Sequence, residues 1–405
     1  MKKSPFLLFA LLTIAFISCE DTNNKNIAFA SEEHKDANGF NYETVNNDPT
    51  GLRLYTLDNG LKVYLSKNSD EPKIQTYVAV RAGSNYDPKE STGLAHYLEH
   101  MVFKGTSKFG TQDWDNEKVL LDSISDLFEL HKAETDKDKK IEIYRQIDKV
   151  SLEASNYSIA NEYDKMVSAL GAQGTNAHTW FEETVYKNKI PANELEKWAK
   201  LESDRFGELV LRLFHTELEA VYEEFNRGQD NDGRKKFSKT LEGLFPIHPY
   251  GQQTTIGTSE HLKNPSLVAI HAYFDKYYVP NNMAVVLVGD IEFEATIKLI
   301  NNTFGKLKNK EVTHPELPKE NPITTPVTQE VFGPTSESVY ITFRTDKIGS
   351  KEEKMVTMVD MILANSQAGL FDLNLNQQQK VQRASSFTIF LNDYGIHFLD
   401  GYPKA

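Results

Sequence analysis

The chain has 405 residues, enough for two or three domains at roughly 150 residues each. Hydrophobic residues make up 39% and charged residues 25%, which is typical of a globular protein with a full core. Lys and Arg number 45 against 58 Asp and Glu, so the net charge is -13. A nucleic-acid binder needs a basic face to neutralise phosphates, and no dense basic patch is present. We therefore expect no nucleic-acid partner.

The N-terminus has the pattern of an export signal. Lys2 and Lys3 precede an almost wholly apolar run, residues 6–17, which is too short to cross a bilayer. The only cysteine, Cys19, follows this run and a small residue, and the arrangement resembles a bacterial lipobox. We expect a signal peptide over 1–18 and an exported lipoprotein, attached to the outer membrane on its periplasmic or cell-surface side. Ordinary signal cleavage beside an incidental thiol is the alternative.

The segment after the signal is polar. Residues 19–47 are rich in Asn, Asp, Glu, Lys and Ser, so we expect a flexible tether that buries too little surface to order itself. Folded sequence begins near Leu52. Two runs of alternating polarity, 52–57 and 61–65, flank Asp58-Asn59-Gly60 and predict a β-hairpin.

Helices and strands alternate along the rest of the chain. Strands are predicted at 75–81, 174–186, 283–289 and 338–343, and helices at 92–103 (with Ser91 or Thr92 as N-cap), 193–213, 215–226, 295–304 and from Glu352. A long charged stretch predicts a pair of helices forming an exposed hairpin, inserted at 111–170. This alternation after an opening hairpin predicts an α+β fold.

Four prolines among polar residues mark a linker at 311–327. The linker separates a first domain, 48–310, from the beginning of a second domain, 328–405. At less than about 80 residues, the second segment is small for an independent core. We expect an incomplete α+β domain there.

The residues that carry chemistry lie in His96-Tyr97-Leu98-Glu99-His100. On a helix the two histidines lie one turn apart on one face, and Glu99 shares that face. Two imidazoles beside a carboxylate suit a catalytic zinc ion, which takes nitrogen and oxygen ligands and keeps one position open for water. A helix with two surface histidines is the alternative, favoured if the chain held no third ligand.

A third ligand is available in the predicted helix at 215–226. Glu217 and Glu224 are seven residues apart and therefore lie on one face, with Ala220 and Val221 between them on a stripe expected to pack inward. A carboxylate on such a stripe is costly to bury unless it is paired or bound to a metal. Spacing alone does not choose between the two glutamates.

Several separate stretches resemble the inverzincin peptidases, the M16 family of pitrilysin, insulin-degrading enzyme and mitochondrial processing peptidase. The resemblance spans roughly 52–345 and is carried by Tyr55–Val63, Arg81–Ser84, Gly93–Thr106, Asn176–Thr179, His248–Gly251, Ile256–Thr258, Tyr277–Met283 and Val288–Asp290. It implies a half-clamshell metallopeptidase domain, an antiparallel-rich mixed sheet packed with helices, and one Zn²⁺ per chain.

The resemblance also implies roles for residues. In the family pattern the later glutamate of the helix is the metal ligand and the earlier one supports the site, so Glu224 is expected as ligand beside His96 and His100, and Glu217 as its support. Zinc would activate a water whose proton Glu99 accepts and passes to the leaving amine.

Asn176 and Ala177 match the family's substrate-edge motif. They imply that a peptide or unfolded protein adds as an extended strand to the edge at 175–179.

Two features depart from the family pattern. His100 and Glu224 are 124 positions apart, which the predicted helical hairpin explains because it enters at a loop. Family members resemble two similar halves that close like a clamshell, whereas this sequence carries one domain and the beginning of another. We expect a second peptidase-like half, in the same longer chain or in a separate subunit. The alternatives are a non-catalytic peptide-binding subunit, or a fragment that is inactive without its second half.

Overall fold

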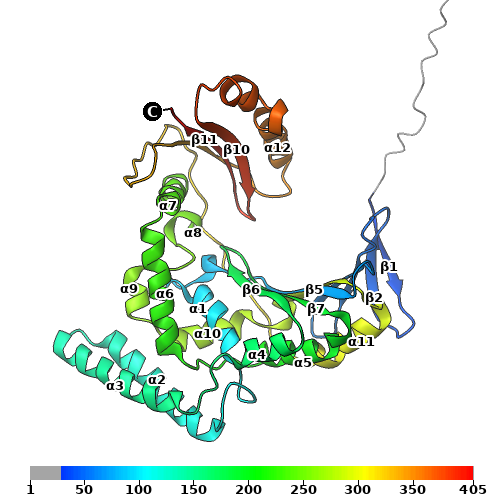
Figure 1. Ribbon diagram of the computed structural model, residues 1–405, viewed down its shortest axis with the longest axis vertical. Helices are drawn as coiled ribbons and strands as arrows, with labels where there is room; N and C mark the ends of the chain where they lie inside the picture. Colours follow the sequence, from blue (N-terminus) through cyan, green and yellow to red (C-terminus); the bar gives the residue numbers. More distant parts are fainter. Residues whose placement is uncertain (1–28, 405) are drawn as a thin grey trace, which may run out of the picture.

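The computed structural model describes residues 29–404, and an eight-stranded mixed sheet forms the base of the first domain (Figure 1). The strand order is β1-β2-β3-β4-β8-β5-β7-β6, and β4 and β8 are its one parallel pair. The strands are β1 Ser31–Lys35, β2 Asn41–Val45, β3 Arg53–Thr56, β4 Lys62–Lys67, β5 Lys73–Val80, β6 Gln173–Thr179, β7 Thr184–Pro191 and β8 Met283–Gly289. The predicted opening hairpin and the predicted strand at 283–289 are confirmed.

Helices cover one face of this sheet (Figure 1). Every second residue of β5 and β7 is buried because its side chain points into the helical layer. The helices of the first domain are α1 Leu94–Met101, α2 Trp114–Ala133, α3 Lys137–Ser155, α4 Glu162–Ala169, α5 Leu195–Arg205, α6 Phe214–Gln229, α7 Asp232–Leu244, α8 Pro249–Gln252, α9 Ser259–Lys263, α10 Leu267–Tyr277 and α11 Phe293–Thr303. The α+β fold prediction is confirmed.

The predicted flexible tether at 19–47 is wrong for residues 31–45. These residues form β1 and β2, and β2 pairs with β3 at the edge of the sheet. Tyr42 packs against Tyr55 with ring centroids 5.2 Å apart, and the guanidinium carbon of Arg53 lies 4.6 Å from the Tyr42 ring. The sheet edge supplies backbone hydrogen-bond partners, and Phe40 and Tyr42 pack against the core, which together order a segment whose composition indicated no core.

Two further predicted elements have different boundaries. The single strand expected at 174–186 is a hairpin of β6 and β7, because the chain reverses at Trp180–Glu183 with a hydrogen bond from the Trp180 amide to the Glu183 carbonyl of 2.8 Å. That turn contains no glycine, proline or asparagine, so composition did not reveal it. The helix expected at 193–213 ends at Arg205, with Phe206 as its C-cap and Gly207 directly after it.

The charged stretch forms the expected pair of long helices. α2 and α3 pack against each other and project from the domain (Figure 1). The third helix, α4, was not predicted as a separate element. Its Tyr163 and Val167 are buried, and the Tyr163 hydroxyl donates to Glu202 at 2.7 Å, so α4 belongs to the layer beneath the sheet.

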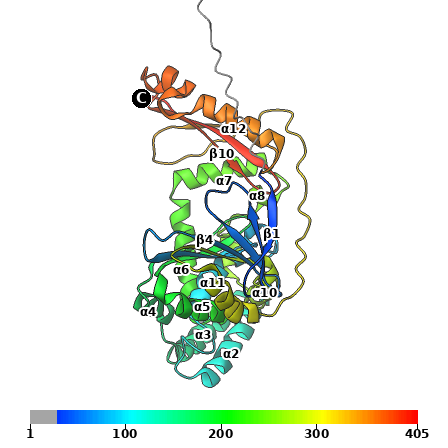
Figure 2. The ribbon, with the colours of Figure 1, turned by 90° about the vertical axis from the view of Figure 1, so that its right-hand side faces the viewer.

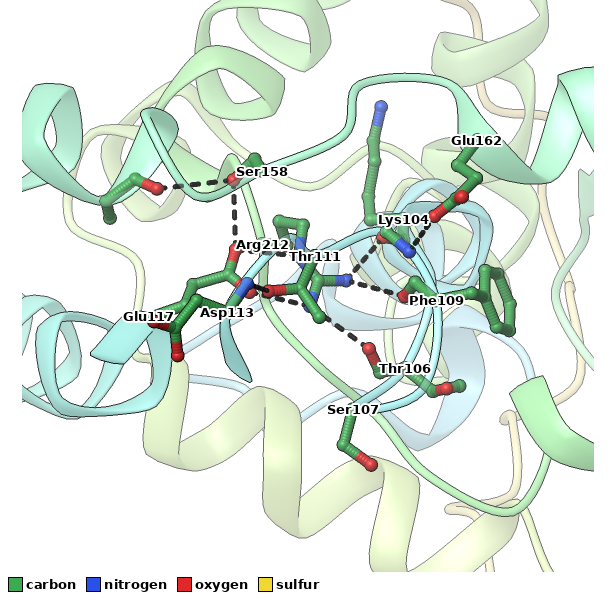
Figure 3. A network of polar contacts seen from close by, with 12 residues as sticks. Lys104, Thr106, Ser107, Phe109, Thr111, Asp113, Glu117, Ser158, Glu162 and Arg212 are labelled. Atoms are coloured by element: carbon green, nitrogen blue, oxygen red, sulfur yellow. Dashed lines mark hydrogen bonds and ion pairs between the residues drawn. The ribbon is translucent and has the colours of Figure 1, made fainter. Parts of the chain in front are cut away.

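A buried ion pair joins the helical hairpin to the rest of the domain (Figure 3). Arg212 donates to both carboxylate oxygens of Glu117 at 2.7 and 2.8 Å, and to the carbonyls of Lys104 and Thr106 at 2.8 and 3.0 Å. The Ser158 hydroxyl donates to the same carboxylate at 2.9 Å. Because Lys104 follows α1 and Arg212 precedes α6, this network fixes the ends of the two helices that carry the histidines and the downstream glutamates.

The second domain is a three-stranded antiparallel sheet with one long helix. It consists of β9 Val339–Thr345, α12 Lys351–Leu363, β10 Arg383–Phe390 and β11 Gly395–Tyr402, in the sheet order β10-β11-β9. Residues 307–338, which precede it, contain no helix or strand. In both ribbon views α7 and α8 lie between the large sheet and this domain (Figure 2).

A hydrophobic cluster and a carboxylate hold the two domains together. Phe181 and Phe245 of the first domain share a buried cluster with Ile396 and Phe398 of the second. Glu182, in the turn between β6 and β7, accepts hydrogen bonds from the Tyr250 hydroxyl and from the Asn392 amide and side chain, the last two at 3.0 and 2.6 Å. The second domain is therefore attached next to the end of β6.

One face of the second domain is apolar and exposed. Val339, Ile341 and Phe343 of β9 and Met358 and Ile362 of α12 are each more than half exposed, at 51 to 65%. Within residues 29–404, no helix is both long and apolar enough to cross a membrane.

Candidate metal centre

α1 carries His96, Glu99 and His100, and a remote aspartate caps its first turn. Asp87 accepts hydrogen bonds from the amides of Gly93 at 2.7 Å and Ala95 at 3.1 Å. The predicted N-cap at Ser91 or Thr92 is wrong, because the left-handed Gly93 precedes the helix and the Thr92 hydroxyl pairs with His261 instead. Burial raises the pKa of Asp87 to about 7, although the helix amides partly oppose that rise.

His96, His100 and Glu224 converge from α1 and α6. Glu224 Oε2 lies 3.5 Å from His96 Nε2 and 3.9 Å from His100 Nε2, and one potential ligand atom from each residue falls within 4.8 Å of the others. Two atoms that each bind zinc at about 2.1 Å with a tetrahedral angle are roughly 3.4 Å apart. The three side chains could therefore hold one zinc ion if their ligand atoms moved closer together.

The three side chains are enclosed on the side of the helices and exposed to solvent on the opposite side. The whole of His96 is 9% exposed, whereas the Glu224 side chain is 37% exposed. Burial, with the charges of His100 and Arg234, lowers the pKa of His96 to about 3, so its imidazole is neutral and available as a ligand. One open side leaves room for water or substrate, as a catalytic rather than structural zinc site requires.

Glu217 orients His100. Its Oε2 lies 3.2 Å from His100 Nδ1, and its Oε1 accepts a hydrogen bond from Lys104. Although burial raises the pKa of Glu217, the hydrogen bonds from His100 and Lys104 outweigh it and lower the pKa overall. Since Nδ1 is engaged in this way, Nε2 is the His100 nitrogen left to bind a metal.

Glu99 faces the edge strand. The Thr179 hydroxyl, on β6, donates a hydrogen bond of 2.7 Å to Glu99 Oε2. Burial raises the pKa of Glu99, and the Thr179 hydrogen bond opposes this rise. A carboxylate with a raised pKa beside a metal site suits proton transfer near neutral pH.

β6 has one free edge among the described residues, since it pairs with β7 alone. Asn176 is exposed and Ala177 is half-buried against the core, and both lie in the regular ladder that ends at Thr179. His178 pairs with Glu183 at 3.4 Å and is not among the converging ligands. β6 thus places Asn176 and Ala177, the predicted substrate contacts, within three residues of Thr179, the hydrogen-bond partner of Glu99.

Some site features were not predicted and one was only partly right. Of the expected inward stripe on α6, Val221 is buried but Ala220 is exposed. Lys104 was missed, although its position four residues after His100 placed it on the same face. Thr179 lay inside the quoted substrate-edge motif, but no local signal linked it to Glu99. Cys19, the predicted lipidation site, lies outside the described residues.

A serine, a histidine and an aspartate also meet in the second domain. Ser386 Oγ and Asp360 Oδ1 both approach His397 Nε2, at 2.7 and 3.2 Å. In a hydrolytic triad the serine and the aspartate bind opposite ring nitrogens. This cluster therefore joins α12 to its sheet and does not form a second catalytic site.

Comparison with known proteins agrees with this geometry. The profile described as "Insulinase (Peptidase family M16)" matches residues 62–118, and the profile "Peptidase M16 inactive domain" matches residues 266–404. Two separate stretches of the chain are thus similar to the M16 peptidase family. The first match includes α1 and its histidines.

Relatives of the chain are named as proteases. Protease 3 of Escherichia coli is 26% identical over 282 residues, which cover 68% of the chain and 24% of the relative. Zinc protease PqqE of Helicobacter pylori is 25% identical over 352 residues, 84% of the chain and 67% of the relative. The chain thus spans about a quarter of the length of Protease 3.

A solved structure supports the fold. A protease from Helicobacter pylori superposes with a TM-score of 0.68 at 22% identity, covering 87% of this chain and 75% of that one. The chain therefore shares its fold with this protease.

Proposed function

We propose that the chain is a zinc-dependent endopeptidase that hydrolyses peptides or unfolded polypeptides. The observation that carries this proposal is the convergence of His96, His100 and Glu224 within 4.8 Å of one another, on one side open to solvent. The matched M16 family and the zinc proteases among its relatives support the same function.

Each residue of the centre has a distinct task. His96 Nε2, His100 Nε2 and a Glu224 oxygen would hold the zinc, and Glu217 keeps His100 in the required tautomer through Nδ1. Zinc, when bound, supplies a Lewis acid that makes water nucleophilic near neutral pH and polarises a peptide carbonyl.

Glu99 serves as general base. Its Oε2 is engaged by Thr179, while its Oε1 has no hydrogen-bond partner within residues 29–404. Oε1 is thus available to take the proton of the attacking water and to deliver it to the leaving amine. The raised pKa of this carboxyl favours the first of these transfers, the uptake of the proton.

Substrate would add as an extended strand along the free edge of β6. Asn176 and Ala177 would contact its backbone, and main-chain hydrogen bonds of this kind tolerate many sequences. Because Thr179 ends the ladder at Glu99, a bound strand would run past the base.

The cellular setting is part of the proposal. We infer that the chain is exported, anchored by a lipid on Cys19 at the outer membrane, and that a second peptidase-like half completes the substrate chamber. A non-catalytic peptide-binding role is the second candidate.

Hydrolysis of a quenched fluorescent peptide by the zinc-loaded protein tests the activity. We expect Glu99→Gln to retain one zinc and to lose hydrolysis by about 100-fold or more, because the base contributes 10²- to 10⁴-fold. Glu183→Gln, an acidic residue of the adjacent turn, is the matched control. Peptide binding without hydrolysis by the wild-type protein would favour the second candidate. Equal hydrolysis by Glu99→Gln and wild type would refute the base assignment.

A further inference from the structure

Arg234, near the start of α7, has a guanidinium group without an ion-pair or hydrogen-bond partner among residues 29–404. The other basic residues of α7 are all paired. Lys235 lies 2.8 Å from Asp232, Lys236 lies 3.5 Å from Asp400, and Lys239 lies 2.5 Å from Glu242. Among residues 29–404, Arg234 is thus the one basic side chain of α7 without such a partner.

A glycine on α6 makes room for this side chain. Gly228 follows Glu224 by four residues and therefore shares its helix face one turn further along. A Cβ placed on Gly228 would lie 3.4 Å from Arg234 Nη1 and 3.8 Å from Arg234 Cδ. The arginine thus lies across the same face of α6 that carries Glu224 and Glu217, and α7 continues directly from α6 (Figure 1).

Arg234 is also exposed, so a ligand can reach it from solvent.

The chemistry of the group indicates its ligand. A guanidinium presents a planar fork of donors that matches a carboxylate in a two-point contact, and such charge-assisted bonds are the stronger kind. No carboxylate of the described residues pairs with the Arg234 guanidinium. Arg234 lies beside α6, the helix that supplies a proposed zinc ligand. The carboxylate that fits its guanidinium is therefore one that arrives with the substrate.

We propose that Arg234 binds a carboxylate of the substrate beside the metal centre and so determines part of its specificity. The carboxylate is either an Asp or Glu side chain or the C-terminal carboxylate of the peptide. One turn of α6 is about 5.4 Å and an extended peptide advances about 3.3 Å per residue, which places this carboxylate within about two or three residues of the scissile bond. This inference rests on the proposed peptidase function.

Binding and hydrolysis of matched peptides test the proposal. One decapeptide series exchanges a single Asp for Asn at successive positions, and a second compares a free C-terminal carboxylate with an amide. Binding is measured by fluorescence anisotropy on Glu99→Gln protein, and kcat/KM on protein with Glu99 intact. Arg234→Gln and Arg234→Lys are compared with Arg145→Gln, an exposed arginine of α3 whose loss changes the net charge equally.

We expect one carboxylate peptide to be preferred over its neutral counterpart by about 10- to 150-fold, the range of a hydrogen bond to a charged group. Arg234→Gln should remove that preference and leave the neutral peptide unchanged, Arg234→Lys should retain part of it, and Arg145→Gln all of it. The peptide series that shows the preference identifies whether the carboxylate is a side chain or the C-terminus.

Binding separates this inference from the proposed activity. Carboxylate-dependent binding that disappears in Arg234→Gln supports the inference even if no peptide is cleaved. No preference for a carboxylate in either series, or a preference that survives Arg234→Gln, overturns it even if hydrolysis is efficient.

Discussion

Replacing Glu217 by Gln tests how the centre is held in its zinc-binding geometry. Glu217 Oε2 lies 3.2 Å from His100 Nδ1, and Oε1 binds Lys104, whose side chain is only 17% exposed. The substitution removes the negative charge that fixes the His100 tautomer and leaves the Lys104 ammonium without its counter-ion. Loss of a carboxylate behind a ligating histidine costs about 10- to 100-fold in metal affinity, or roughly 1.4 to 2.7 kcal/mol.

The assay is a competition for zinc against a fluorescent chelator of known affinity. Glu219→Gln is the matched control, because Glu219 lies on the same helix, is exposed and has no partner within residues 29–404. We expect the zinc dissociation constant to rise about 10- to 100-fold in Glu217→Gln and to change less than about twofold in Glu219→Gln. Equal affinities in both variants would refute the role of Glu217, and with it the assignment of His100 Nε2 as ligand.

Three further substitutions test the framework around the centre. Arg212→Met leaves Glu117 buried without its partner, so we expect a loss of about 3 to 5 kcal/mol in the free energy of unfolding, measured with urea; a loss below about 1 kcal/mol would contradict the network. Glu182→Ala removes the acceptor of Asn392, and hydrogen–deuterium exchange should accelerate in the turn between β6 and β7; unchanged protection there would show that the hydrophobic cluster alone joins the domains. Asp87 has a folded-state pKa of about 7 against 3.8, so the folded state holds more protons than the unfolded state between pH 4 and 7, and stability falls as pH rises through that window. Asp87→Asn should flatten this part of the stability profile, and an unchanged slope measured by urea unfolding at pH 4 to 7 would disprove the raised pKa.

Local patterns predicted much of the framework. The hairpin around Asp58-Asn59-Gly60 and the buried strand at 283–289 were found because a turn type and an apolar run are encoded over a few residues. The two long helices α2 and α3 followed from a periodicity sustained over many turns. The convergence of three side chains was foreseen because His96 and His100 share one helix face and a family pattern selected Glu224.

Long-range contacts account for what was missed. Asp87 caps α1 from a separate loop, and Arg212 pairs with Glu117, which lies 95 residues away in the sequence. The hairpin of β1 and β2 is ordered by an existing sheet edge, which its own composition does not show. Arg234 was not predicted either, since the position of its side chain beside Gly228 depends on how α7 follows α6.

Zinc binding by single-ligand variants tests the central claim most directly. Equilibrium dialysis of the metal-free protein against zinc, with zinc X-ray absorption spectra of the loaded form, reports stoichiometry and ligand type. We expect one zinc per chain, about two imidazole nitrogens at roughly 2.0 to 2.1 Å, and loss of that zinc in His96→Ala, His100→Ala and Glu224→Ala. Wild-type protein that binds no zinc, or a Glu224→Ala variant that binds it as tightly as wild type, would contradict the account.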